Sequence, residues 1–338
     1  MYPLIRSLLF ALPPEWAHLV VLKLLSKYNE TSGTDDSRQS VSVGHLKCAN
    51  RVGLAAGFDK DGLAIEGLSR LGFGFLEFGA VTPRIQAGNP HPRIFRLKND
   101  LALINRLGFN NNGVDALAQK LSISRNSVKI PIGVNIGKNT DTSNNDAVTD
   151  FAYCFNQVKS VSDFVTVNIS SPNTSQLRDL QSDENIVRLL GVLVGARDAH
   201  FAQSKYYVSL FVKISPDMEE DETVALCRRI KDAGCDGIVA TNTTTNRPAI
   251  RDRRRDEDGG LSGKPLLPLA LRAVRIVRSA VGPTFPVIGC GGVWDAESAK
   301  QMIKAGADLV QIYTSLIYRG PRCISEMAVA LGQKEQIS

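Results

Sequence analysis

Short apolar runs rich in β-branched residues alternate with amphipathic helical stretches about eight times between residue 44 and the C-terminus. The runs that we expect to form strands are residues 52–56, 74–78, 130–134, 164–168, 208–214, 237–241, 286–289 and 309–313. Helical stretches, such as residues 219–233 and 296–305, separate these runs. This alternation is typical of parallel strands joined by helices, and about eight repeats favour a closed barrel over an open doubly wound sheet. We therefore predict an α/β fold, a (β/α)8 TIM barrel, over residues 41–338.

The first 30 residues carry a large apolar surface on two short predicted helices, which Pro13-Pro14 separates. Leucines recur at every fourth position of the first helix, and the apolar face of the second consists of Trp16, Leu19, Val20 and Leu24. The longest stretch without a charged residue, 7–14, is too short to span a bilayer. The residues alone leave two interpretations open: a helical hairpin packed on the barrel, or a helix pair lying in a membrane interface. Residues 31–40 (TSGTDDSRQS) form a polar linker, so residues 1–40 are expected to be an N-terminal helical extension.

Composition excludes several classes of protein. Lys and Arg number 40 against 34 Asp and Glu, and no aromatic residues alternate with a basic stripe, so nucleic-acid binding is not expected. The six cysteines form no CxxC pair and are expected to be buried thiols, and the four histidines lack metal-ligand spacing, so no metal is predicted. For the Arg-rich segment 247–255, we favour a solvated loop over a lipid-headgroup contact.

Residues just past the predicted strands should gather at the catalytic end of the barrel. Nearly all of them are Gly, Asn, Lys, Ser or Thr, which indicates a neutral pocket rich in hydrogen-bond donors. Gly289, Gly291 and Gly292 would let backbone N–H groups approach a phosphate, and residues 313–315 can begin a short helix facing the same anion.

Amides and lysines at these strand ends suit a planar ligand and an anionic substrate. The amides are Asn105, Asn168, Asn173 and Asn242. Lys213, within the apolar run SLFVKI, is a candidate for stabilising the charge of a reduced flavin, and Lys60 for holding a substrate carboxylate. Ser170 or Ser171 is a candidate proton acceptor, although serine is a poor base unless water or a neighbour takes the proton onward.

The motifs together resemble those of the dihydroorotate dehydrogenases, specifically the membrane-associated class that passes electrons to quinones. The matching segments, in chain order, are AAGFDKDG (55–62), FGAVTPRIQAGNPHPRIFRL (78–97), INRLGFNN (104–111), VNIGKN (134–139), VNISSPNT (167–174), VKISPD (212–217), ATNTT (240–244), GGLSGKPL (259–266), IGCGGV (288–293) and GADLVQIY (306–313). The match covers essentially the whole chain, including the N-terminal helices.

The resemblance implies the contacts of the cofactor and the substrate. FMN would contact Ala56, Gly57, Phe58, Asp59, Lys60, Ala80, Asn135, Asn168, Lys213, Thr241, Gly263, Gly292, Tyr313 and Thr314. Dihydroorotate would contact Lys60, Asn105, Arg106, Leu107, Gly108, Phe109, Asn168, Asn173, Asn242 and Thr243. The quinone-linked class commonly has threonine where this chain has Ala80, so a backbone contact to FMN survives there and a hydroxyl contact is lost.

The resemblance also implies the reaction. Ser171 matches the catalytic base of the quinone-linked class, where the soluble class uses cysteine. It would take the C5 proton of dihydroorotate while hydride leaves C6 for the flavin, giving orotate for UMP synthesis. His18, Arg96 and Tyr313 match positions near the quinone tunnel, so the resemblance favours the membrane for residues 1–30.

Two alternatives remain, and both are disfavoured: a soluble fumarate- or NAD-linked enzyme of the same type, and a membrane-docked flavoprotein without turnover. Ser171 and the apolar extension oppose the first, and the intact catalytic loop opposes the second. We expect a peripheral protein on the cytoplasmic side of a bacterial inner membrane, because an Arg-rich presequence poor in acidic residues is lacking. No obligatory protein partner is expected.

Overall fold

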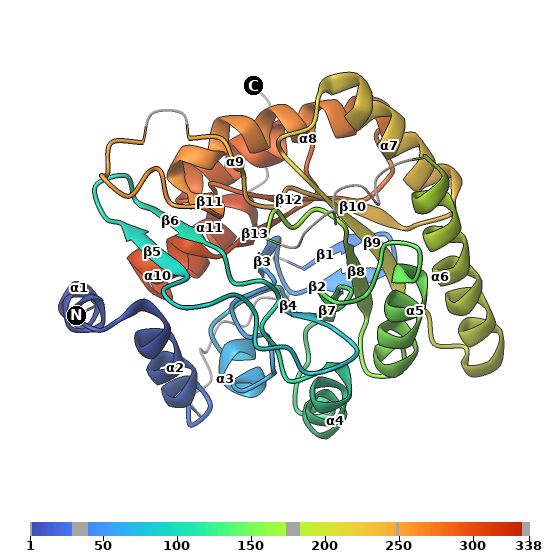
Figure 1. The fold of residues 1–338 in the computed structure, drawn as a ribbon, viewed down its shortest axis with the longest axis horizontal. Coiled ribbons are helices and arrows are strands. Elements are labelled where there is room, and N and C mark those ends of the chain that lie inside the picture. The colour runs from blue at the N-terminus through green and yellow to red at the C-terminus, as the bar shows by residue number, and fades with distance from the viewer. Residues whose placement is uncertain (1, 29–39, 174–182, 248–249, 333–338) are drawn as a thin grey trace.

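The computed structural model describes residues 2–28, 40–173, 183–247 and 250–332. Eight parallel strands close into a barrel in which the last strand pairs with the first (Figure 1). Around the barrel these are β3 (Val52–Leu54), β4 (Phe75–Val81), β7 (Ile132–Ile136), β8 (Phe164–Asn168), β9 (Ser209–Ile214), β10 (Gly237–Ala240), β12 (Val287–Cys290) and β13 (Leu309–Ile312). The predicted barrel is therefore confirmed, and each expected strand overlaps an observed one.

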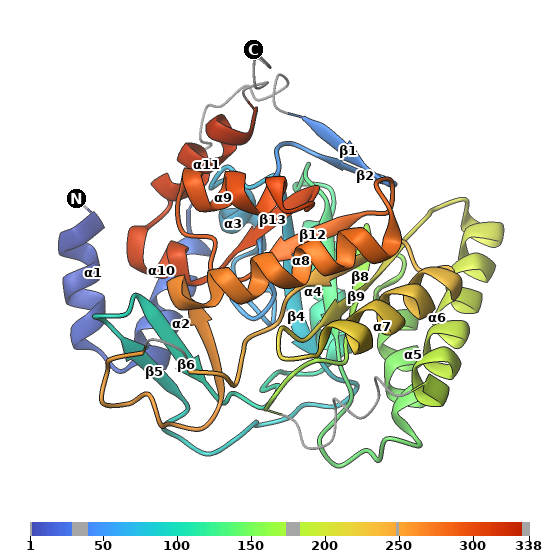
Figure 2. The same cartoon turned by 90° about the horizontal axis from the view of Figure 1, so that it is seen from above.

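Helices follow the strands and cover the outside of the barrel (Figures 1 and 2). They are α3 (Ile65–Ser69), α4 (Val114–Ser124), α5 (Ala147–Val158), α6 (Asp183–Ser204), α7 (Glu220–Asp232), α8 (Leu267–Val281), α9 (Ala296–Lys304), α10 (Thr314–Arg319) and α11 (Arg322–Gly332), with a short 3-10 helix at Lys264–Leu266. In α7, the alternation of buried Thr223, Leu226, Cys227 and Ile230 with charged positions produces the one-sided face that packs on the sheet.

Three phenylalanines fill the barrel interior at the amino ends of the strands. The rings of Phe75, Phe164 and Phe211 stack edge to face, with centroids 6.1 and 5.7 Å apart. Each ring fills the space beside a glycine on the neighbouring strand, and a Cβ added at Gly53 would lie only 2.2 Å from the Phe75 ring. The amino end is thus closed by packed apolar side chains, which leaves the carboxyl end for a ligand.

Two smaller sheets were not predicted. A hairpin of β1 (Val41–Val43) and β2 (Leu46–Cys48) precedes the barrel. A second, antiparallel sheet joins β5 (Ile94–Leu97), β6 (Ala102–Asn105) and β11 (Gly260–Gly263), with β6 in the middle. This sheet lies between the N-terminal helices and the barrel (Figures 1 and 2).

The two predicted N-terminal helices are present as α1 (Tyr2–Ala11) and α2 (Pro14–Leu25), and one side of each packs on the barrel. The Tyr2 hydroxyl donates to the carbonyl of Ile317 at 2.6 Å, and the Phe10 ring meets the Tyr318 ring edge to face at 5.2 Å. On α2, Ala17 and Leu22 are buried. For the side of the helices that faces the barrel, the interpretation of a helical hairpin packed on the barrel is therefore correct.

The other side of these helices is apolar and exposed. Leu4, Leu8, Trp16 and Leu24 have exposed fractions of 75%, 74%, 70% and 65%. Among the described helices, none combines the length and the apolar character needed to cross a membrane. Of the predicted linker, residues 31–39 lie outside the described residues.

The six cysteines are buried, as predicted. In the Arg-rich segment, Arg251, Arg253 and Arg255 are exposed, whereas Arg247 and Arg254 bond within the protein. Arg247 donates to the carbonyl of Thr244 at 3.0 Å, and Arg254 pairs with Asp252 at 3.1 Å. Part of this segment is thus solvated and part of it holds its own loop in place.

Candidate active site

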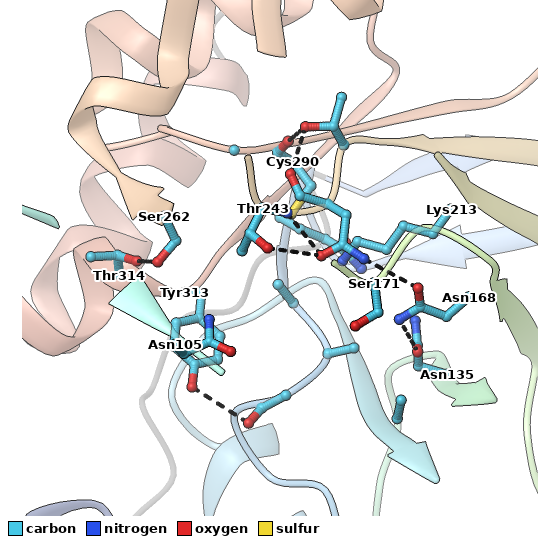
Figure 3. A pocket seen from close by; sticks show the side chains of 18 of the residues that line it. Asn105, Asn135, Asn168, Ser171, Lys213, Thr243, Ser262, Cys290, Tyr313 and Thr314 are labelled. Carbon is cyan, nitrogen blue, oxygen red and sulfur yellow. Dashed lines mark hydrogen bonds between the residues drawn. The ribbon is translucent and has the colours of Figure 1, made fainter. Parts of the chain in front are cut away.

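A cavity opens at the carboxyl ends of the barrel strands (Figure 3). The expected FMN contacts that line it are Ala56, Gly57, Lys60, Ala80, Asn135, Asn168, Lys213, Thr241, Gly263, Gly292, Tyr313 and Thr314. The expected substrate contacts that line it, besides Lys60 and Asn168, are Asn105, Leu107, Gly108, Phe109, Asn173, Asn242 and Thr243. The proposed base, Ser171, lines it as well. Residues far apart in sequence thus meet at one end of the barrel.

Three expected contact residues do not line this cavity. Phe58 and Asp59 line a neighbouring cavity, and the Asp59 carboxylate accepts two backbone N–H groups before α3, at 2.8 and 2.9 Å. The Arg106 guanidinium pairs with Glu257 at 2.8 Å and lines neither cavity. The side chains of Asp59 and Arg106 therefore hold the local fold, and a ligand contact by Arg106 would have to use its backbone.

Several of the amides form one hydrogen-bonded array (Figure 3). The Nδ2 atom of Asn242 donates to Oδ1 of Asn168 at 3.1 Å, and Nδ2 of Asn168 donates to Oδ1 of Asn135 at 2.9 Å. Nδ2 of Asn135 in turn donates to Oε1 of Glu77 at 2.7 Å. We call Asn135, Asn168 and Asn242 the amide array. The second N–H of Asn135 and that of Asn168 have no acceptor among the described residues, so the array can still donate to the carbonyl groups of a ligand.

The two serines of the catalytic loop differ in where they lie. Ser170 is fully buried, and its hydroxyl accepts from Nδ2 of Asn242 at 3.1 Å, so it supports the array. Ser171 lines the cavity, and its hydroxyl accepts the backbone N–H of Asn173 at 3.3 Å. The structure thus selects Ser171 of the two as the serine that a ligand can reach.

Both candidate lysines project into the cavity. Lys213 is buried and pairs in register with Asn168 on the adjacent strand. Lys60 lies on the loop after β3, where its ammonium bonds Oδ1 of Asn110. Burial lowers the pKa of Lys60 to about 7, because water is excluded from its charged form. A ligand carboxylate beside Lys60 would supply the missing counter-charge.

A glycine-lined end of the cavity fits a phosphate. Gly263 and Gly292 have φ values of +100° and +74°, and a Cβ at Gly292 would lie 2.3 Å from the backbone nitrogen of Leu267. The hydroxyls of Ser262 and Thr314 bond each other at 2.9 Å beside these glycines, and α10 begins at Thr314 as predicted. Close backbone approach and hydroxyl donors are what a phosphate needs. With the amide array at the other end, the residues fit a flavin phosphate.

A second, larger cavity of about 840 Å³ lies between α2 and the barrel. His18 and Tyr313, two of the expected quinone contacts, line it. Burial lowers the pKa of His18 to about 4 and raises that of Tyr313 to about 12, so both are neutral near pH 7. The residues that line both cavities are Gly57, Lys60, Leu107 and Tyr313. The two cavities therefore adjoin at these four residues.

Arg96, the third expected quinone contact, does not line this cavity. Its guanidinium donates to the carbonyls of Leu12 at 2.8 Å and Phe10 at 3.3 Å, and it stacks on the Phe10 ring at 4.5 Å. Arg96 thus satisfies carbonyls at the C-terminal end of α1, which otherwise lack partners. Its observed role is to anchor α1.

Some residues of the site were not found from the sequence. Glu77 and Gln311 lie within apolar strand segments, so nothing in their spacing set them apart. Ser262 lies on β11, a strand that was not predicted, although the motif GGLSGKPL contains it. Cys290 lines the cavity within the motif IGCGGV, where only the glycines were considered.

Comparisons with known proteins agree with this architecture. A family model described as dihydroorotate dehydrogenase matches residues 38–334. The chain is 45% identical over 342 residues to "Dihydroorotate dehydrogenase (quinone)" of Acidovorax sp. (strain JS42), covering 98% of this chain and 97% of the relative. It is 46% identical over 334 residues to the protein of the same name from Marinomonas sp. (strain MWYL1), covering 96% and 95%.

Solved structures agree as well. The DHODH of Eimeria tenella in complex with ferulenol is 36% identical and superposes with a TM-score of 0.89, covering 94% of this chain and 90% of that one. The ligand-free form from the same organism gives a TM-score of 0.88, with 94% of each chain covered.

Proposed function

The chain belongs to the dihydroorotate dehydrogenase family, and we infer from this how the residues of its two cavities carry out the family reaction. The enzyme oxidises dihydroorotate to orotate in pyrimidine biosynthesis, with a quinone as electron acceptor. Its cofactor is a flavin, and we propose FMN because the glycine-lined end of the cavity suits a phosphate. A bound FMN supplies the hydride acceptor for dihydroorotate and the electron donor for the quinone.

Ser171 is proposed to take the proton from C5 of dihydroorotate. Loss of this proton, together with loss of a hydride from C6, leaves the C5–C6 double bond of orotate. Among the described residues, no carboxylate or imidazole is hydrogen-bonded to the Ser171 hydroxyl, which otherwise contacts the backbone of Asn173. Since serine is a weak base, the proton must pass onward to water.

Lys60 and the amides are proposed to hold the substrate. The Lys60 ammonium would pair with the carboxylate of dihydroorotate, which restores the charge that burial disfavours. Nδ2 of Asn173 bonds Oδ1 of Asn105 at 3.3 Å, so these two amides are held together at the rim of the cavity. With Asn168 and Asn242, they offer directional partners to the carbonyl and N–H groups of the pyrimidine ring.

Lys213 is proposed to stabilise the reduced cofactor. Its ammonium is buried in the cavity wall, where a fixed positive charge acts more strongly than in water. A flavin gains negative charge on reduction, so Lys213 favours the reduced state. Neutralising Lys213 should therefore slow the first half-reaction and lower the flavin reduction potential.

The second cavity is proposed as the quinone site. It is lined mainly by apolar groups of α2 and the barrel, and it meets the first cavity at Tyr313 and Lys60. His18 packs edge to face on Phe58 with ring centroids 5.1 Å apart, and both residues line the cavity. A quinone ring in this cavity would adjoin the flavin cavity at these shared residues.

We propose that residues 1–40 form the segment for membrane docking and quinone access, and that residues 41–338 form the catalytic domain. The exposed leucines of α1 and α2 together with Trp16 suit a membrane interface. This placement supports a peripheral enzyme, and we propose the cytoplasmic side of a bacterial inner membrane as its location.

The observation that carries this function is the meeting of the two cavities at shared residues. It predicts that the two half-reactions can be impaired separately. Ser171→Ala should slow flavin bleaching by dihydroorotate at least about 100-fold, yet leave reoxidation by a quinone unchanged. Leu19→Trp, which enlarges a side chain in the wall of the second cavity, should do the reverse. Stopped-flow absorbance measures both, and a variant that slows both steps equally would contradict the assignment.

A further inference from the structure

The reaction proposed for the two cavities requires a proton to enter the second one. Oxidation of dihydroorotate removes a proton from C5 and a hydride from C6, and the proton leaves to water at the first cavity. The hydride equivalent supplies two electrons and one proton, whereas a quinone needs two electrons and two protons to become a quinol. One proton must therefore reach the quinone from solvent while the quinone occupies the second cavity.

One exposed residue in the wall of the second cavity can carry a proton. The exposed residues that line this cavity are Pro13, Trp16, Leu19, Leu63, His91 and Pro92. Trp16 and Leu19 belong to the surface that we propose to contact lipid, and the hydrocarbon of a membrane holds no water that could supply a proton. An imidazole, in contrast, exchanges protons with water near neutral pH. Among the exposed lining residues, His91 is thus the candidate for proton uptake.

A carboxylate connects His91 to the wall of the cavity. Nδ1 of His91 lies 2.5 Å from Oε2 of Glu15, and the exposed fractions of the two side chains are 67% and 23%. The other oxygen of Glu15, Oε1, accepts from Nε of the buried Arg93 at 2.9 Å. Arg93 is itself fixed, because its Nη1 donates to the carbonyls of Ala87 at 2.7 Å and Asn89 at 3.0 Å. The Glu15 carboxylate is therefore held with Oε2 on the imidazole.

The Glu15 carboxylate also acts on the inner wall of the second cavity. Burial lowers the pKa of His18, and the Glu15 charge opposes part of this decrease. Burial raises the pKa of Tyr313, and the same charge raises it further. Because Coulomb interactions weaken with distance, these effects place Glu15 near His18 and Tyr313, which are the expected quinone contacts in this wall.

The other titratable groups that line this cavity are less suited to bring in a proton. They are His18, Asp59, Lys60, Asp61, Arg93 and Tyr313. Asp59 and Asp61 each accept a backbone N–H group at 2.8 Å, and an arginine does not release its proton in a protein. Lys60 is assigned to the substrate carboxylate, and none of the six is exposed.

We propose that Glu15 and His91 form a proton relay, which brings the second proton of quinone reduction from water into the second cavity. The imidazole takes a proton from water at Nε2 and releases one from Nδ1 to Oε2 of Glu15. An N–H bond of His91 breaks as an O–H bond of Glu15 forms. That O–H bond breaks in turn as an O–H bond of the quinol forms, while the two electrons arrive from the reduced cofactor. The proposal rests on the proposed function, because it takes the second cavity as the quinone site.

The experiment reduces the flavin of the holoenzyme without oxygen, adds a saturating quinone and follows reoxidation by stopped-flow absorbance. We expect His91→Ala and Glu15→Gln to slow reoxidation at least about tenfold and to leave bleaching by dihydroorotate unchanged. Imidazole added to the buffer should restore His91→Ala, since it can replace the missing ring. It should not restore Glu15→Gln, which still lacks the carboxylate. A loss of packing alone would not respond to imidazole.

Binding of the quinone provides a measurement that does not depend on turnover. Trp16 lines the cavity, so quenching of tryptophan fluorescence in the oxidised holoenzyme gives the quinone dissociation constant. For His91→Ala we expect a value within about twofold of the parent, because the relay acts on the proton rather than on binding. The matched control is His45→Ala: His45 is an exposed imidazole stacked on Tyr207 at 4.0 Å, and it lines neither cavity. This variant should reoxidise like the parent with or without imidazole.

The relay is overturned if His91→Ala reoxidises as fast as the parent or if imidazole does not restore its rate. Slower reoxidation accompanied by equally weaker quinone binding would also overturn it, since His91 would then only support the site. If Glu15→Gln does not fold, His91→Ala alone decides, because His91 is exposed. If dihydroorotate does not bleach the parent flavin, dithionite reduces it instead and the same comparison is made. A reduced parent that no quinone reoxidises would refute the proposed function together with the relay.

Discussion

Gly292→Ala should cause loss of the flavin, because both the backbone and the surroundings of Gly292 exclude a side chain. The residue has a φ of +74°, and an added Cβ would lie 2.3 Å from the backbone nitrogen and 2.4 Å from the Cα of Leu267, where α8 begins. The left-handed conformation costs a residue with a Cβ about 1–2 kcal/mol. Overpacking adds about 1–3 kcal/mol. Because Leu267 is held by α8, the glycine loop must move away and disturb the proposed phosphate site.

The total of about 2–5 kcal/mol corresponds to a fall of roughly 3–7 °C in the thermal midpoint for a chain of this size. We expect flavin to dissociate at least about tenfold more readily, since 1.4 kcal/mol is a factor of ten in affinity. The assay is the flavin-to-protein ratio after dilution and gel filtration, with the thermal midpoint measured in parallel.

Two other glycines are matched controls. Gly282 also has a positive φ, +85°, but an added Cβ would have no atom within 4 Å, so Gly282→Ala should lower stability by about 1–2 kcal/mol and keep the flavin. Gly195, in α6, likewise has open space, and Gly195→Ala should stabilise the helix by about 0.5–1 kcal/mol. If Gly292→Ala keeps as much flavin as Gly282→Ala, the assignment of Gly292 to the proposed phosphate site is refuted.

Three further predictions concern the substrate, the quinone and the membrane. The Lys60 ammonium is lost as pH rises through its lowered pKa of about 7, so the KM for dihydroorotate should rise several-fold from pH 7 to 9. The variant Lys60→Arg should remove this rise, and a KM of the parent that does not change with pH would contradict the prediction. Glu15 pairs at 2.9 Å with the buried Arg93, so Glu15→Gln should weaken the packing of α2 on the barrel by about 1–2 kcal/mol and raise the KM for the quinone but not for dihydroorotate. Equal changes in the two KM values would argue against the assignment of the second cavity to the quinone. Replacing the exposed Leu4 and Leu8 with serine should weaken co-sedimentation with lipid vesicles at least about tenfold. The control Val329→Ser, on α11, should leave vesicle binding unchanged, and unchanged binding by the Leu4 and Leu8 variant would place the membrane contact elsewhere.

The barrel was predictable because its signal is repeated along the chain. Each strand is a short apolar run buried on both faces, such as β8, whose predicted and observed bounds are both 164–168. The strand ends then place Asn168 and Lys213 in adjacent positions without further information. The order of strands around a parallel barrel follows the order along the chain, so no long-range pairing had to be guessed.

The sheet of β5, β6 and β11 was missed for the opposite reason. Its strands have four residues each, and β11 pairs with β6 across more than 150 positions of sequence. Local patterns carry no information about such a pairing. The position of Ser262 in the cavity depends on this sheet, so it was missed as well.

Two individual residues, Glu77 and Arg96, have partners that neither the sequence pattern nor the resemblance could provide. A glutamate inside an apolar strand, such as Glu77, gives no indication in the sequence of whether it faces solvent or a buried amide. Arg96 was expected at the quinone site, but its donors are used by backbone carbonyls at the end of α1. The partners of a long charged side chain depend on which helix end happens to lie beside it, and only the structure provides this.

The central claim is that one cavity oxidises dihydroorotate and the adjoining one reduces a quinone. The most direct test is to purify the protein in mild detergent, add dihydroorotate without oxygen and follow the flavin absorbance. The account predicts rapid bleaching, followed by recovery of the absorbance on addition of a quinone but not of fumarate or NAD. A flavin that stays oxidised with dihydroorotate, or that fumarate or NAD restores as fast as a quinone does, would contradict it.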